Sequence, residues 1–124
     1  MKKKSTTCFS IAEEVYPNDP AQLNRYKKQR EENGFDDTET WHLDKTFALF
    51  IIPRLKRFIK VNNGFPNGET YESYIEKLKF IVKSFEEYYY EEDNDSSLEI
   101  EKERLQNAKN AVNTLSQLWF HLWW

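Results

Sequence analysis

The sequence predicts an all-α fold, a compact helical bundle of three long helices plus one or two shorter N-terminal helices. Three observations lead to this prediction. Apolar residues recur at helical spacing in three long segments, and no segment alternates apolar and polar residues as a half-buried strand does. The chain also has only three glycines and four prolines, which suits long helices joined by short connections. With nine Phe, seven Tyr and four Trp, aromatic side chains are expected to dominate the packing.

The N-terminal part is expected to contribute least to this core. We expect residues 1–18 to form a weakly ordered segment and residues 19–124 to form a single helical domain. Within the first segment, Ser10 and Glu13 have the spacing of a capping box, which predicts a short helix from Ile11.

A second helix is predicted by its end signals. Asp19 is a favourable N-cap, Pro20 occupies the first helical position, and Gly34 stands just past the expected end. Leu23 and Tyr26 are almost its only apolar residues, so this helix is expected to lie on the surface of other elements.

The first long helix is predicted to follow Asp36, which with Glu39 has the spacing of a second capping box. Pro53 lies inside it and costs about 3 kcal/mol, but six large apolar side chains at helical spacing outweigh that cost. One bent helix is therefore expected, ending at residues 62–64. Its apolar residues are Leu43, Phe47, Phe50, Ile51, Leu55 and Phe58.

The second long helix has the clearest pattern. Thr70 is its expected N-cap. Lysines and glutamates cover one face, and the opposite face is apolar. That apolar face comprises Tyr71, Tyr74, Ile75, Leu78, Ile81, Val82, Phe85 and Tyr89.

The last helix is expected to open with Ser96 and Glu99 as a capping box. Apolar residues then recur every seven residues, a spacing that predicts packing against an antiparallel neighbour, the preceding helix. These residues are Leu98, Leu105, Val112 and Trp119, accompanied by Ala108, Leu115 and Leu122.

Two aspartates are candidate metal ligands. Asp37, Trp41 and Asp44 share one stripe of the first long helix, and the two carboxylates are hard oxygen ligands of the kind that magnesium or manganese prefers. The structural alternative, which we favour, is a capping acid followed by an aspartate paired with an arginine or a backbone amide. With only two histidines and no glycine-rich phosphate loop, the sequence predicts no catalytic residues, no enzyme and no cofactor.

An acidic segment is the most unusual feature. Acidic residues are dense from Glu86 to Glu103, and three tyrosines precede the centre of this run. The functional hypothesis is that these residues bind a basic groove on a partner protein, and the structural alternative is a hydrated loop between two helix ends. The candidate partner-binding residues are Tyr88, Tyr89, Tyr90, Glu91, Glu92, Asp93 and Asp95.

Seven basic residues could form a basic face for nucleic acid, and these are Lys27, Lys28, Arg30, Arg54, Lys56, Arg57 and Lys60. These residues are spread around their helices and the chain has a net charge of −3, so nucleic acid is ranked third among the expected partners. At the other end of the chain, Trp123 and Trp124 continue past the apolar stripe. They either fold back over the bundle or join a second copy in a homo-oligomer.

The expected location is the cytoplasm. Cys8 is the single cysteine, which fits a reducing compartment, and no apolar run reaches the ~20 residues of a membrane span. The basic N-terminal residues are not followed by the apolar core of a signal peptide.

The chain resembles a set of small uncharacterised proteins encoded by bacteriophages and related mobile elements. The resemblance rests on "FDDTETWHLDKTFALFIIPRLKRFIK", "GFPNGET" with "YIEKLKFIVKSFE", and "LQNAKNAVNTLSQLWFHLWW". The shared pattern FDD, W.LD and PRLK matches Asp36, Asp37, Trp41, Asp44, Pro53, Arg54 and Leu55. It implies a phage-type setting and a host cytoplasm, but no activity.

These observations favour a small binding protein that acts through protein–protein interaction. An inhibitor of a host defence system, of the anti-CRISPR kind, is one concrete form of this hypothesis. The alternatives are a carboxylate-dependent metal or nucleotide-binding protein that uses Asp37 and Asp44, and a structural subunit that assembles through its tryptophan-rich end.

Overall fold

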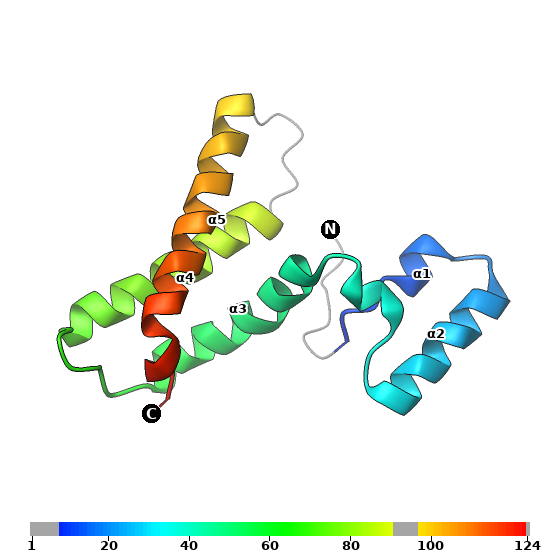
Figure 1. Ribbon diagram of the computed structural model, residues 1–124, viewed down its shortest axis with the longest axis horizontal. Helices are drawn as coiled ribbons and strands as arrows, with labels where there is room; N and C mark the ends of the chain where they lie inside the picture. Colours follow the sequence, from blue (N-terminus) through cyan, green and yellow to red (C-terminus); the bar gives the residue numbers. More distant parts are fainter. Residues whose placement is uncertain (1–7, 91–96, 124) are drawn as a thin grey trace. The chain divides into compact units, whose positions relative to one another are not determined.

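The structure, a computed structural model, describes residues 8–90 and 97–123. These residues form five α-helices and two short 3-10 helices, and no strand is found among them (Figure 1). The all-α prediction, with three long helices after two shorter ones, is confirmed. In chain order the elements are α1 (Ala12–Val15), α2 (Pro20–Asn33), η1 (Asp37–Thr40), α3 (Leu43–Val61), α4 (Tyr71–Tyr89), α5 (Leu98–Leu118) and η2 (Trp119–His121).

The chain forms two units, residues 1–51 and residues 52–124. The first contains α1, α2, η1 and the first part of α3. The second contains the rest of α3 together with α4, α5 and η2. Among the helices of the described residues, none combines the length and the apolar character needed to span a membrane.

The start of the described chain is tied to the first unit by hydrogen bonds. Phe9 donates its backbone amide to Glu39 over 3.1 Å, and Ile11 donates its amide to the hydroxyl of Thr38 over 3.0 Å. The predicted short helix is present as α1, but Ser10 is not its N-cap and does not form the expected capping box with Glu13. N-cap Ile11 offers no side-chain hydrogen bond, and the hydroxyl of Ser10 instead accepts the amide of Ala12.

The predicted boundaries of α2 are confirmed. The side chain of Asp19 accepts a hydrogen bond from the amide of Gln22, and Pro20 begins the helix. Gly34 ends it in the left-handed conformation, with φ of +85°, which a residue without a Cβ adopts at little cost.

The helix expected directly after Asp36 is divided in two. Asp36 and Glu39 do form the predicted capping box, but the element they cap is η1, and α3 begins only at Leu43. In a continuous α-helix the carbonyl of Glu39 would accept the amide of residue 43. Here that carbonyl accepts the hydroxyl of Thr46 over 2.8 Å.

The prediction that the helix continues through Pro53 is confirmed, since α3 is unbroken from Leu43 to Val61. Ile52 and Leu55, on either side of the proline, are almost fully buried. Their burial offsets the lost backbone hydrogen bond.

Helix α4 supplies half of the buried apolar residues of the second unit. The hydroxyl of Thr70 accepts the amide of Ser73, and the hydroxyl of Ser73 accepts the amide of Thr70, which completes a reciprocal cap. Tyr71 remains exposed, whereas most of the predicted apolar face is buried. The buried apolar residues are Tyr74, Ile75, Leu78, Ile81, Val82 and Phe85.

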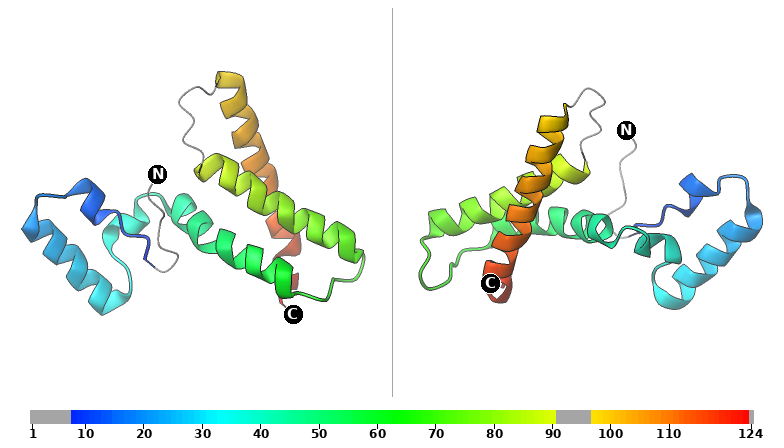
Figure 2. Two further views of the ribbon diagram at one scale, coloured as in Figure 1. Left: turned by 180° about the vertical axis from the view of Figure 1, so that it is seen from behind. Right: turned by 45° about the horizontal axis from the view of Figure 1, so that its top comes forward.

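Helix α5 buries only part of its predicted face, since Ala108 and Leu115 are buried as expected but the residues that recur every seven positions are not. The seven-residue stripe is exposed, with Leu98 at 66% and Val112 at 56%. The buried residues are the predicted Ala108 and Leu115 together with Ala111 and Leu118, which the pattern does not include. Figures 1 and 2 show that α5 crosses α4 and does not run alongside it. The two small alanines allow close approach at such a crossing. The predicted cap is also wrong, because Ser97, one residue later than expected, accepts the amide of Ile100.

Candidate functional site

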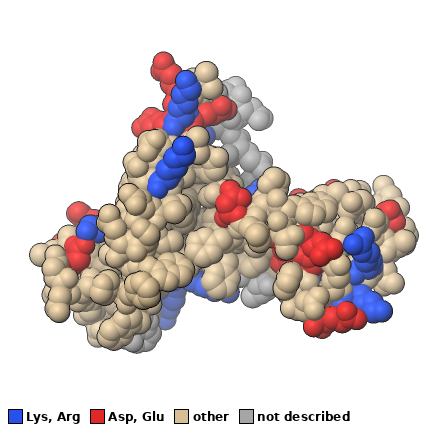
Figure 3. All heavy atoms as spheres, viewed as in Figure 1, with Lys and Arg blue, Asp and Glu red and all other residues tan. Residues whose placement is uncertain are grey.

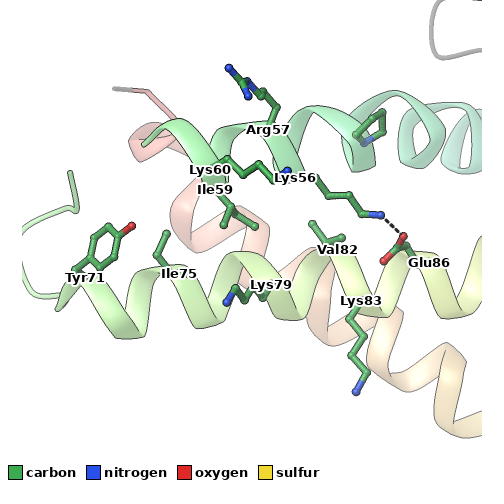
Figure 4. A pocket seen from close by; sticks show the side chains of 11 residues that line it. Lys56, Arg57, Ile59, Lys60, Tyr71, Ile75, Lys79, Val82, Lys83 and Glu86 are labelled. Carbon is green, nitrogen blue, oxygen red and sulfur yellow. Dashed lines mark ion pairs between the residues drawn. The ribbon is translucent and has the colours of Figure 1, made fainter. Parts of the chain in front are cut away.

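A groove with a volume of about 890 Å³ opens between α3 and α4 in the second unit (Figure 4). Each helix contributes one face. From α3 come Pro53, Lys56, Arg57, Ile59 and Lys60. From α4 come Tyr71, Ile75, Lys79, Val82, Lys83 and Glu86. Since the α4 residues recur at three- or four-residue spacing from Tyr71 to Glu86, the groove follows about 22 Å of that helix.

The charges in this groove are strongly unbalanced. Five lining side chains are basic, and Glu86 is the single acidic one. Glu86 pairs with Lys56 over 2.7 Å, so this ion pair joins the two helices. Within the part of the chain that the structure describes, Arg57, Lys60 and Lys79 form no ion pair.

The bottom of the groove is apolar. Ile59, Ile75 and Val82 lie in the space between the helices, whereas Arg57 and Lys83 extend outward from the α3 and α4 sides (Figure 4). Tyr71 closes one end, and its ring remains exposed. An apolar floor between basic rims can bind a ligand that offers apolar groups on one side and negative charges on its edges.

The sequence contained part of the signal for this site. The basic face expected from the sequence contains Lys56, Arg57 and Lys60 of α3, but it joins them to residues of α2, which belongs to the other unit. The sequence pattern places Lys79 and Lys83 among the lysines and glutamates opposite the apolar face of α4. Their four-residue spacing in line with Ile75 and Tyr71 indicates one face, but only the position of α3 shows that this face borders a groove.

The predicted acidic site is described only at its start. Tyr88 is exposed, but its neighbours are partly buried. Tyr89 lies edge-on to Phe85 with ring centroids 6.2 Å apart, and Tyr90 is the C-cap residue of α4. Burial, reinforced by the charge of Glu86, raises the pKa of Tyr90. Glu91, Glu92, Asp93 and Asp95 lie outside the described residues, as does Trp124.

The C-terminal aromatic residues remain largely exposed. Phe120 is 84% exposed and Trp123 is 74% exposed, although Trp123 lines a small pocket with Phe65, Pro66 and Tyr74. The turn that carries them is held by the hydroxyl of Tyr74, which donates to the carbonyl of His121 over 2.6 Å. Figure 3 shows a largely uncharged surface over the C-terminal part of α5, where the sequence has no charged side chain after Lys109.

The two candidate metal ligands are not brought into a cluster. Asp37 lies in η1, where its carboxylate accepts hydrogen bonds from Gln29 at 3.0 Å and from Arg25 at 3.4 Å. Asp44 lies in the first turn of α3. Over residues 8–90 and 97–123, no three His, Cys, Asp or Glu side chains are grouped closely enough to hold a metal ion.

The neighbouring Asp36 organises a buried polar cluster in the first unit. Its carboxylate accepts hydrogen bonds from the hydroxyl of Ser10, from both the amide and the hydroxyl of Thr38, and from Arg30 at 2.5 Å. Burial acts to raise the pKa of Asp36, but these hydrogen bonds together outweigh it and hold the pKa below its usual value. The cluster lies in a different unit from the groove and has a structural role, because every oxygen of the carboxylate is engaged.

No protein-family model, curated protein or solved structure matches this chain. The chain is therefore assigned to a class by its own features, as a small all-α protein with a basic, apolar-floored groove.

Proposed function

We propose that the protein is a binding protein that acts through protein–protein interaction, and that the groove between α3 and α4 binds an acidic amphipathic helix of its partner. The observation that supports this proposal is the combination of five basic side chains with an apolar floor along two adjacent helices. Such a groove complements a helix that has an apolar stripe and acidic flanks.

The dimensions of the groove fit a helical ligand. A length of about 22 Å corresponds to roughly 15 residues of α-helix. A partner helix of this length presents apolar residues at positions i, i+4, i+7 and i+11. These residues would lie over Ile59, Ile75 and Val82, and acidic residues on either side would approach Lys60 and Lys79.

The apolar floor favours a protein ligand over a nucleic acid. A phosphate backbone would use the basic rims but would make no apolar contact with the floor formed by Ile59, Ile75 and Val82. The chain as a whole also carries a net charge of −3, which opposes the approach of a long polyanion.

The experiment compares four fluorescent ligands by anisotropy. The first is an amphipathic peptide of about 16 residues with leucines at helical spacing and glutamates elsewhere. The others are a scrambled peptide of the same composition, the same peptide with lysine in place of glutamate, and a single-stranded DNA of matched charge. The proposal predicts clear binding of the first peptide alone. It is overturned if the scrambled peptide or the DNA binds equally well, or if no ligand binds.

The identity of the partner stays a prediction. The resemblance to phage and mobile-element proteins favours a partner that is a protein of the host cell. We propose specifically that the partner is a component of a host defence system. Measuring whether a candidate defence protein competes with the acidic peptide for the groove would test it directly.

A further inference from the structure

We propose that Glu86 competes intramolecularly with the ligand of the groove. In the free protein Glu86 pairs with Lys56, and in the complex a carboxylate of the partner takes the place of Glu86. This inference rests on the proposed function, because it describes how the same groove is regulated. It makes the Lys56–Glu86 ion pair a switch between a free state and a bound state.

The composition of the groove supports this role. Glu86 is the only acidic side chain among the eleven that line it, and it lies at one end of the α4 face, 15 positions after Tyr71. Its carboxylate contacts Lys56 over 2.7 Å across the two helices, as the dashed line in Figure 4 shows. It therefore offers Lys56 the same chemical group that an acidic ligand would bring.

The exposure of the pair makes such an exchange feasible. The side chain of Lys56 is 54% exposed and that of Glu86 is 32% exposed, so neither partner is sealed in the core. Exposed ion pairs contribute little net free energy. A ligand carboxylate backed by apolar contacts along the floor can therefore replace Glu86, whose own side chain can turn toward water.

An alternative role for the same ion pair makes the opposite prediction. If the pair served only to clamp α3 onto α4, its loss would loosen the groove and weaken binding. Neutralising Glu86 therefore distinguishes a competitor from a clamp by the sign of the change in affinity.

The test uses the full chain and the acidic amphipathic peptide described above. Glu86→Gln is expected to strengthen peptide binding by roughly threefold to fivefold, the upper part of the range that exposed ion pairs contribute. Glu76→Gln is the matched control, because Glu76 is exposed on the same helix, outside the groove, and its loss changes the net charge equally. Glu76→Gln is expected to leave the affinity for the peptide roughly within twofold of wild type.

A double-mutant cycle identifies the group for which Glu86 competes. In a Lys56→Gln background, Glu86→Gln is expected to give no further gain, because the shared cation is gone. The proposal is overturned if Glu86→Gln weakens binding or leaves it unchanged. It is equally overturned if the gain persists without Lys56, since Glu86 would then act only through long-range charge.

Circular dichroism and thermal unfolding of each variant confirm that the helices are intact. Failure of the wild-type protein to bind the peptide would instead contradict the proposed function itself.

Discussion

A guanidinium nitrogen of Arg30 lies 2.5 Å from a carboxylate oxygen of Asp36, whose side chain is completely buried. This contact joins the end of α2 to the start of η1. The hydroxyl of Ser10 reaches both partners, so one carboxylate holds three segments of the first unit together.

The first prediction concerns two adjacent aspartates in very different environments. Asp36→Ala is expected to destabilise the first unit by about 3 kcal/mol, because it leaves Arg30 and Thr38 without their acceptor. Asp37→Ala is the control, since its side chain is 53% exposed, and it is expected to cost under about 1 kcal/mol. Urea unfolding followed by NMR signals of the first unit measures both values. Equal costs would contradict the role assigned to Asp36.

The second prediction concerns acid stability. The pKa of Asp36 is lower in the folded chain than the ordinary value of 3.8, so the unfolded chain binds more protons in mildly acidic solution. The stabilisation is therefore fully present above pH 3.8 and is lost as the pH falls through that value toward the folded pKa. Unfolding free energies of the first unit, measured from neutral pH downward, are expected to fall in this window. In Asp36→Asn this part of the pH dependence is expected to disappear, and a variant with an unchanged profile would rule out Asp36 as its source.

The third prediction tests which face of α5 packs on α4. Leu115→Ala is expected to cost about 3 kcal/mol, because Leu115 is buried in the second unit and its truncation leaves a cavity. Leu105→Ala is the matched control from the exposed seven-residue stripe and is expected to cost under about 1 kcal/mol. Chemical denaturation of the second unit gives both numbers. A larger cost at Leu105 would show that the seven-residue stripe is the true packing face.

Local signals in the sequence were sufficient for most helix ends. Asp19, Gly34 and Thr70 act within a few residues of their own position, so their patterns predict α2 and the start of α4 correctly. The continuity of α3 through Pro53 was also predictable, because it depends on the balance between one lost hydrogen bond and the apolar residues around it.

Features that depend on tertiary arrangement could not be predicted in this way. The pattern of α5 indicates the correct neighbour and the buried Ala108 and Leu115, but its seven-residue repeat stays exposed, because a repeat does not report the crossing angle between two helices. The cluster around Asp36 requires Ser10 and Arg30, which lie 26 and 6 positions away. The groove likewise depends on α3 lying beside Lys79 and Lys83 of α4, and this arrangement is visible only in the three-dimensional structure.

The most direct test of the proposed function is the affinity of the acidic amphipathic peptide for two charge-reversal variants with the same net charge. Lys60→Glu with Lys79→Glu places a negative charge on each helix of the groove. Lys102→Glu with Lys109→Glu makes the same change on exposed positions of α5. The account predicts that the groove variant loses at least about tenfold in affinity and that the α5 variant stays within about threefold of wild type. Equal losses in the two variants, or an unchanged affinity in the groove variant, would contradict it.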